Sequence, residues 1–145
     1  MIWLRIHGSL LELERGDPEL ALTYASEAYD LAAGTGEAPE QAMARAIIAG
    51  AEGVLGESDD ALKGFSDAAR GLQHSPARYE YAEVMRLWGL FLVDIGRPND
   101  AAERLAVAHD TFGGIGAEGR RARVERALHA LGRGPSPRPA TGPGQ

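Results

Sequence analysis

Apolar side chains recur along this chain at the spacing of α-helices. In residues 18–33 they fall three or four positions apart, at Ala21, Leu22, Ala25 and Ala28. Residues 58–73 repeat this spacing, at Ala61, Leu62, Phe65, Ala68, Ala69 and Leu72. Such a stripe lies on one face of a helix, whereas a strand would alternate apolar and polar residues. The pattern therefore predicts helices that each bury one face.

The pattern has a period of 40 residues. Glycine opens each turn, and alanine follows five residues later, in the columns Gly16, Gly56, Gly96 and Ala21, Ala61, Ala101. A fixed period of about 20 to 50 residues indicates a repeat architecture. Each block is interpreted as two helices that meet at the glycine, which closes the first helix in the left-handed conformation. The predicted first helices span 2–15, 41–55 and 77–95, and the second helices span 18–33, 58–73 and 98–112.

Several helices have recognisable N-terminal signals. Asp17 is predicted to cap a second helix, with Pro18 at the first helical position. Ser58 is predicted to cap the next second helix, and Ser75 with Pro76 is predicted to open the first helix of the third block. The alanine columns follow from close packing, because helices joined by a tight turn need small side chains where their backbones cross.

These elements predict an all-α solenoid of antiparallel helix pairs, in which stacked blocks bury what a single block cannot. Residues 1–131 form the predicted repeat domain, with repeats at 1–40, 41–80 and 81–116 and a capping helix at 117–131. The outer face of that cap is predicted to carry Arg120, Arg121, Arg123 and Arg126. Residues 132–145 hold eight Gly or Pro in 14 positions, which predicts a disordered tail.

The third block carries the columns of a known motif. Large and small positions alternate in its first helix at Trp88, Gly89 and Leu92, and its second helix has Ala101, Leu105 and Ala108. These positions resemble the tetratricopeptide repeat, and the resemblance covers residues 1–131. The first two blocks depart from the motif at its tryptophan and aromatic positions, which are Arg5, Arg45, Glu12 and Glu52. The resemblance implies a right-handed solenoid whose first helices line a concave face.

The period of 40 residues is longer than the usual tetratricopeptide period of about 34. It is similar to the helical repeats of large ATP-binding bacterial regulators of the LuxR class, as is the closing phrase AHDTFGGIGAEGRRARVERALHALG. In those regulators a DNA-binding helix-turn-helix usually follows, whereas here a Gly/Pro-rich stretch follows. The resemblance implies an interaction or sensing module, and fold alone establishes neither.

Composition narrows the function classes. The 145 residues contain no cysteine, which excludes disulfides and thiolate metal sites. We expect a cytoplasmic protein, because the chain has no run of about 18 apolar residues and no signal-peptide pattern. Residues 1–114 carry a net charge of −10 and residues 115–145 a net charge of +4. The acidic body makes nucleic acid an unlikely partner, and a nucleic-acid interface on the arginine-rich helix is the third-ranked alternative.

No motif predicts catalysis, a cofactor or a metal. The glycines of 114–119 have dinucleotide-binding spacing, but a helix precedes them instead of the required strand, so they are interpreted as a turn between repeats. His109 has no other histidine at ligand spacing, and the carboxylates form no ligand motif with a histidine. We therefore expect a protein that is not an enzyme, with no cofactor and no metal.

The predicted concave face is the candidate binding surface. Its residues are taken from the inward positions of the first helices: Trp3, Ile6, Leu10, Met43, Glu83, Arg86, Leu90, Arg123 and Arg126. The groove lacks the Lys/Asn set that clamps a peptide carboxylate in chaperone-binding members of the resembled family. Simple burial is the competing interpretation for Trp3, Ile6 and Leu10.

The predicted partner is a protein or peptide segment in this groove. The alternative is a sensor segment of a bacterial transcriptional regulator that lacks its ATPase and helix-turn-helix parts. The first helix has no N-terminal cap and no polar end face, although solenoid ends are usually polar. Either residues 1–20 pack on another protein or a second copy, or Met1 is an internal start and earlier repeats are missing.

Overall fold

The computed structural model describes residues 2–133, and within them every regular element is a helix. The helices are α1 (Ile2–Glu14), α2 (Pro18–Thr35), α3 (Ala38–Val54), α4 (Ser58–Leu72), α5 (Arg78–Asp94), α6 (Pro98–Gly114) and α7 (Glu118–Ala130). The predicted all-α class is confirmed for this part of the chain. Most of the predicted disordered tail, 132–145, lies outside the described residues.

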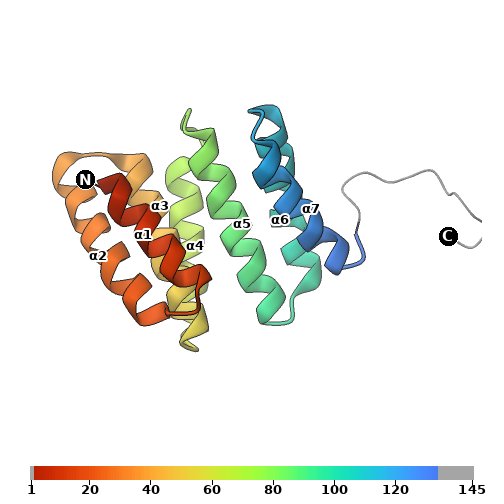
Figure 1. Ribbon diagram of the computed structural model, residues 1–145, viewed down its shortest axis with the longest axis horizontal. Helices are drawn as coiled ribbons and strands as arrows, with labels where there is room; N and C mark the ends of the chain where they lie inside the picture. Colours follow the sequence, from red (N-terminus) through yellow and green to blue (C-terminus); the bar gives the residue numbers. More distant parts are fainter. Residues whose placement is uncertain (1, 134–145) are drawn as a thin grey trace, which may run out of the picture.

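Each helix packs against its neighbours in the chain, and the structure extends from α1 and α2 at one end, through α3, α4 and α5, to α6 and α7 at the other (Figure 1). The helices α1, α3 and α5 also contact one another in sequence, α1 with α3 and α3 with α5. This is the packing expected when helix pairs stack side by side, because each first helix then meets the first helix of the next block. The arrangement is compatible with an α-solenoid.

All of the helix connections except the one between α4 and α5 use one recurring turn. Glycine adopts the left-handed conformation in it, with φ between 76° and 90°, at Gly16, Gly36, Gly56, Gly96, Gly116 and Gly132. The residue after the glycine donates its backbone N–H to the carbonyl five positions back, for example Asp17 to Glu12 at 2.9 Å and Glu57 to Glu52 at 2.8 Å. This hydrogen bond satisfies carbonyls that the helix end leaves free. The predicted role of the column glycines is confirmed.

The turn also decides where the next helix begins. Asp17 caps α2 as predicted, because its Oδ1 accepts a hydrogen bond from the Leu20 N–H at 3.1 Å. The prediction for Ser58 is wrong, since it is the first residue of α4 and Glu57 occupies the cap without a side-chain bond. At every turn of this kind between two helices the cap is the residue after the left-handed glycine, whatever its side chain.

The starts of α5 and α3 also differ from the prediction, whereas α6 begins at Pro98 as predicted. Ser75 and Pro76 lie before α5, which begins at Arg78, and the Ser75 hydroxyl accepts from the Ala77 N–H at 3.0 Å. The helix α3 begins at Ala38 instead of residue 41, because Pro39 lies in its first turn, where proline is favourable.

The alanine columns are buried. Ala21, Ala61 and Ala101 are completely buried, each near the start of a second helix.

We expect Ala61→Leu to lower the free energy of unfolding by about 1–3 kcal/mol, because the larger side chain forces packed helices apart. Urea denaturation measures this cost. Ala33→Leu, at an exposed position of α2, is the control and should change stability by less than about 0.5 kcal/mol. Equal costs for the two variants would contradict the role of the column.

Candidate functional site

A cleft of about 340 Å³ lies where four helices come together. We call it the central cleft, and it is lined from α1 by Leu13 and Glu14, from α3 by Gly50, Gly53 and Val54, from α5 by Arg86, Leu87, Leu90, Phe91 and Asp94, and from α7 by Arg123. The α5 residues share one helix face because they recur at intervals of three to four positions. The cleft thus combines apolar side chains with charges of both signs.

Two glycines of α3 allow neighbouring helices to approach at the cleft. A Cβ atom at Gly53 would lie 2.6 Å from the Phe91 ring, and one at Gly50 would lie 2.9 Å from Leu13 Cδ2. Real Cβ atoms do not come so close to carbon, so a larger residue would displace Phe91 or Leu13. The lack of side chains on α3 therefore helps to shape the cleft.

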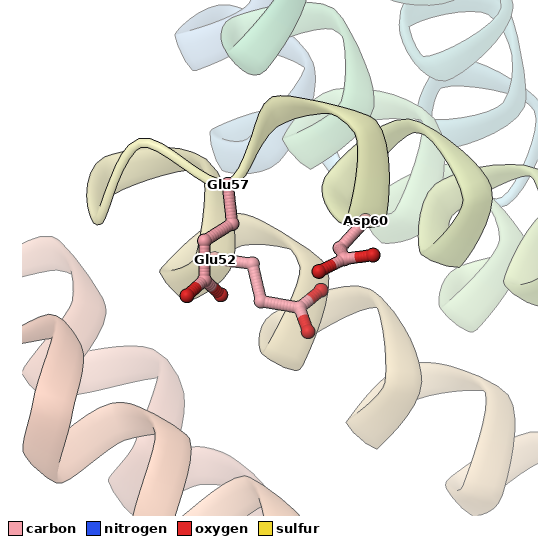
Figure 2. Close-up of side chains that lie close together, drawn as sticks. All are labelled: Glu52, Glu57 and Asp60. Carbon is pink, nitrogen blue, oxygen red and sulfur yellow. The ribbon is translucent and has the colours of Figure 1, made fainter.

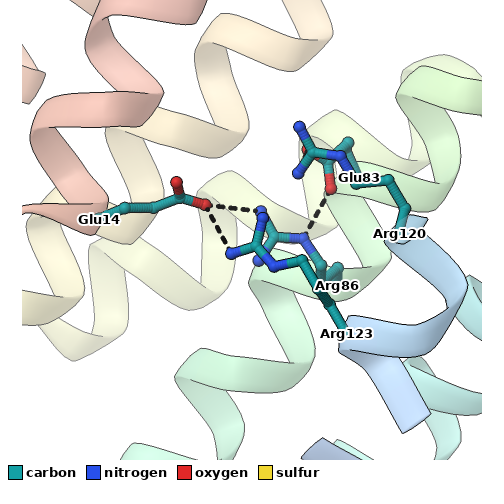
Figure 3. Close-up of polar contacts among 5 residues, drawn as sticks. All are labelled: Glu14, Glu83, Arg86, Arg120 and Arg123. Atoms are coloured by element: carbon teal, nitrogen blue, oxygen red, sulfur yellow. Dashed lines mark hydrogen bonds and ion pairs between the residues drawn. The ribbon is translucent and has the colours of Figure 1, made fainter. Parts of the chain in front are cut away.

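An ion-pair network joins three helices beside this cleft (Figure 3). Glu14 Oε2 at the end of α1 accepts hydrogen bonds from Arg86 Nη2 at 3.3 Å and from Arg123 Nη2 at 3.2 Å. Arg86 Nε donates to Glu83 Oε1 at 2.6 Å within α5. Arg120 Nη1 of α7 lies 3.1 Å from Glu83 Oε2, which makes an ion pair without the geometry of a hydrogen bond. The network links helices that are far apart in the sequence.

The centre of the network is buried. The Glu83 side chain is 1 % exposed and that of Arg86 is 5 % exposed. Burial alone lowers the pKa of Arg86, but the charge and hydrogen bond of Glu83, together with those of Glu14, raise it above its ordinary value. Arg86 is therefore a permanent cation, and Glu83 is the counter-ion that makes its burial tolerable.

The structure separates the predicted groove residues. Arg86, Leu90 and Arg123 line the central cleft, and Glu83 lies in the ion-pair network next to it. Ile6, Leu10 and Met43 are buried in the hydrophobic core, where no partner can reach them in this conformation.

The other two predicted residues lie elsewhere. Trp3 is exposed near the start of α1 and stacks on His7, with ring centroids 4.9 Å apart. Arg126 is exposed on α7. The predicted outer face of the cap also needs correction, since Arg120 and Arg123 turn towards Glu83 and Glu14 instead of outwards. The physical reason is charge pairing, because the carboxylates of Glu83 and Glu14 would otherwise lack these two cationic partners.

Sequence reasoning missed Glu14. It occupies the same repeat position as two other lining residues of the cleft, Val54 and Asp94, which follow it at intervals of 40. The 40-residue register could therefore have identified this column, but not the charge pairing across it. That pairing depends on contacts between residues 72 and 109 positions apart.

Three carboxylates gather at the turn between α3 and α4, from Glu52, Glu57 and Asp60 (Figure 2). Their ligand atoms all lie within 4.8 Å of one another, close enough to hold a divalent cation. Burial raises the pKa of Glu52, and the charges of Asp60 and Glu57 add to this, although Arg45 opposes them. Arg45 Nη1 lies 3.6 Å from Glu52 Oε1 and already supplies a positive charge there. Glu57 and Asp60 lie at the start of α4, where acidic residues are favourable, and Glu52 lies in the last turn of α3 with Arg45 as its cation.

The raised pKa of Glu52 predicts a pH-dependent loss of stability. Stabilisation from protonated Glu52 is present below its ordinary pKa of 4.5 and is lost as the pH rises through the higher folded-state pKa. Glutamine mimics the protonated form, so Glu52→Gln should gain stability relative to the unmodified protein as the pH rises above 4.5. Urea denaturation at several pH values measures this difference. Two parallel stability curves would contradict the prediction.

His109 joins α6 to α7. Its Nε2 lies 2.9 Å from Glu125 Oε2, and its Nδ1 lies 3.3 Å from Asp110 Oδ1. The hydrogen bond to His109 holds the pKa of Glu125 below its ordinary value. Residues 115–117 form a turn between helices as predicted, with Gly116 in the left-handed conformation, whereas Gly114 ends α6 and Gly119 lies in the first turn of α7.

Comparisons with protein-family models, with curated proteins and with solved structures gave no match. None of the helices within residues 2–133 has the length and hydropathy needed to span a bilayer.

Proposed function

We propose that this protein is a non-enzymatic interaction module that binds a segment of a partner protein in the central cleft. In this proposal the helix pairs form a right-handed solenoid of the tetratricopeptide type, and the central cleft lies on its concave side. The observation that carries the proposal is the exposure of an apolar side chain beside fixed charges. Leu90 is 37 % exposed and lines the same cleft as Arg86 and Arg123.

This combination suits recognition of a peptide or helix. Apolar anchors supply most of the affinity at an interface, and surrounding charges select and orient the partner. The lining side chains project from helices held by a common core, so binding does not require them to be ordered first. The cleft therefore acts through its shape and its preformed surface.

The test compares two positions with the same exposure. Leu90 in the cleft is 37 % exposed and Val107 on α6, outside the cleft, is 38 % exposed. A photoreactive amino acid is placed at either position, and the proteins that it cross-links in the native cell are identified. We expect a partner that is captured from position 90 and not from position 107.

Affinity for that partner is then measured by calorimetry with the purified proteins. Leu90→Glu should weaken binding at least about tenfold, or about 1.4 kcal/mol, and Val107→Glu should leave it unchanged. The proposal fails if the same proteins are captured from both positions, or if Leu90→Glu binds as tightly as the unmodified protein.

A small effector is the second candidate, because the volume of about 340 Å³ falls within the range of ligand pockets, about 300–1,000 Å³. Under this alternative the protein is the sensor segment of a regulator. Native mass spectrometry of the protein isolated from its own cells distinguishes the two. A bound small molecule that is absent from Leu90→Glu would favour the effector, whereas a protein partner at position 90 would favour the interaction module.

A further inference from the structure

The outward face of α1 is apolar and uncovered. Leu4 is 67 % exposed and Leu11 is 57 % exposed, which makes them two of the most exposed large apolar residues of the described chain. They are seven positions apart and therefore lie on the same face of the helix. Gly8 lies between them on that face. Exposed apolar patches of this kind mark interaction surfaces.

The repeat register shows that these positions are interface positions elsewhere in the chain. The residues that follow Leu4 at intervals of 40 are all buried, and they are Ala44, Val84 and Val124. Those that follow Leu11 are the buried residues Ala51 and Phe91 and the half-buried residue Leu131. Among the helices of residues 2–133, α1 alone has this face exposed. It is thus built like the packed faces of α3, α5 and α7, and the described chain supplies nothing that covers it.

A hollow at Gly8 distinguishes the α1 face from its counterparts. The equivalent residues in the later helices are large, namely Ile48, Trp88 and Leu128. In α1 the missing side chain leaves a hollow of about 300 Å³, which is lined by Leu4, Arg5, Gly8 and Tyr24. The hollow is large enough to receive an apolar side chain from a packed helix.

We propose that this face docks on the same face of a second copy of the chain, with the two α1 helices antiparallel. A two-fold interface requires that residue i meets residue j and that j meets i. An antiparallel pair centred near Gly8 meets this condition, because Leu4 of each copy then lies opposite Leu11 of the other. Leu11 of the second copy reaches the hollow between Leu4 and Gly8.

Charge complementarity favours this arrangement. We call the contact line formed by Leu4 and Leu11 of the two copies the seam. Arg5 and Glu12 each follow one of these leucines by one position, so both lie on the same flank of the helix. In an antiparallel pair the corresponding flanks of the two helices face each other and run in opposite directions. Arg5 of each copy therefore comes opposite Glu12 of the other copy. Within one chain Arg5 pairs with Glu27 at 2.5 Å, and both of these side chains are exposed. Glu12 lies 3.5 Å from Arg15, and the Glu12 side chain is half-buried, with 20 % of it exposed. Ion pairs at the surface contribute little stability, so Arg5 can exchange Glu27 for Glu12 of a second copy.

The first test is the molar mass in solution, measured by sedimentation equilibrium on the full chain. We expect a concentration-dependent dimer, with twice the chain mass of 15.4 kDa. Leu4→Glu with Leu11→Glu should raise the dissociation constant at least about tenfold, because it buries like charges at the seam. Val93→Glu with Val107→Glu, at exposed positions on α5 and α6, is the matched control and should dimerise normally.

The second test identifies the partner as another copy in antiparallel orientation. Arg5→Glu and Glu12→Arg should each dimerise more weakly than the unmodified chain, because like charges then meet across the seam. An equimolar mixture of the two variants should recover dimers that contain one copy of each, since opposite charges are restored at both contacts. Far-ultraviolet circular dichroism confirms that every variant is folded.

Three results would overturn the proposal. One is a monomer at every concentration up to about 1 mM, where even weak association is visible. Another is a dimer that dissociates no more readily when Leu4→Glu and Leu11→Glu are combined. The third is a mixture of Arg5→Glu and Glu12→Arg that associates no better than either variant alone.

Discussion

Replacing Arg86 with alanine is expected to lower the free energy of unfolding by about 3–5 kcal/mol. Arg86 donates the 2.6 Å hydrogen bond to Glu83, whose carboxylate is buried and also forms an ion pair with Arg120 of α7. Without Arg86, the closest remaining cation is Arg120, which lies 3.1 Å from Glu83 but lacks hydrogen-bond geometry. A buried carboxylate without a full partner is costly, because it has lost water and gained little in return. Urea denaturation followed by circular dichroism measures the loss.

The control removes both charges together. Glu83→Leu with Arg86→Met leaves no buried ion at this place, and buried ion pairs replaced by apolar residues are often as stable as before. We therefore expect the double variant to be at least about 2 kcal/mol more stable than Arg86→Ala. If Arg86→Ala costs less than about 1 kcal/mol, the network is solvated in solution and does not hold α5 and α7 together.

This network marks the limit of what the sequence predicts. The turns were predictable because a left-handed glycine is a local requirement, and Gly16, Gly56 and Gly96 repeat it at a fixed interval. The alanine columns were predictable for a related reason, since small residues at a helix crossing follow the same period. Local rules that recur with the repeat are therefore visible in one sequence.

The candidate site depends on contacts between residues that are far apart in the sequence. Glu83 and Arg86 were predicted to face a partner, but both are buried. Whether a charge at such a position faces a partner or an internal counter-ion depends on Glu14, Arg120 and Arg123. Those contacts join α1, α5 and α7, and no periodic pattern encodes them. For the same reason the pattern did not distinguish Leu90, which lines the cleft, from Leu10, which is buried in the core. The central cleft is therefore a product of tertiary packing.

An aromatic cluster joins α4 to α5 through apolar contacts, whereas the ion-pair network around Glu83 joins helices through charges. Phe65 on α4 is fully buried, and its ring centroid lies 5.6 Å from that of Phe91 and 6.3 Å from that of Trp88, both on α5. The three rings span the boundary between two predicted blocks, where the connection is the longer 73–77 segment instead of the recurring glycine turn. The three rings thus connect α4 to α5 across this boundary through side-chain packing.

Phe65→Ala is expected to cost about 3–5 kcal/mol, the loss typical of a buried phenylalanine and of the cavity that remains. Trp88→Ala should cost less, although tryptophan is larger, because Trp88 is only half-buried and its outer side is covered by the Arg104 guanidinium, 4.1 Å from the ring centroid. Urea denaturation of both variants gives the order. Phe65→Leu keeps most of the apolar volume and should retain more than half of the lost stability. A larger cost for Trp88→Ala than for Phe65→Ala would mean that the Trp88 ring, rather than Phe65, holds the two blocks together.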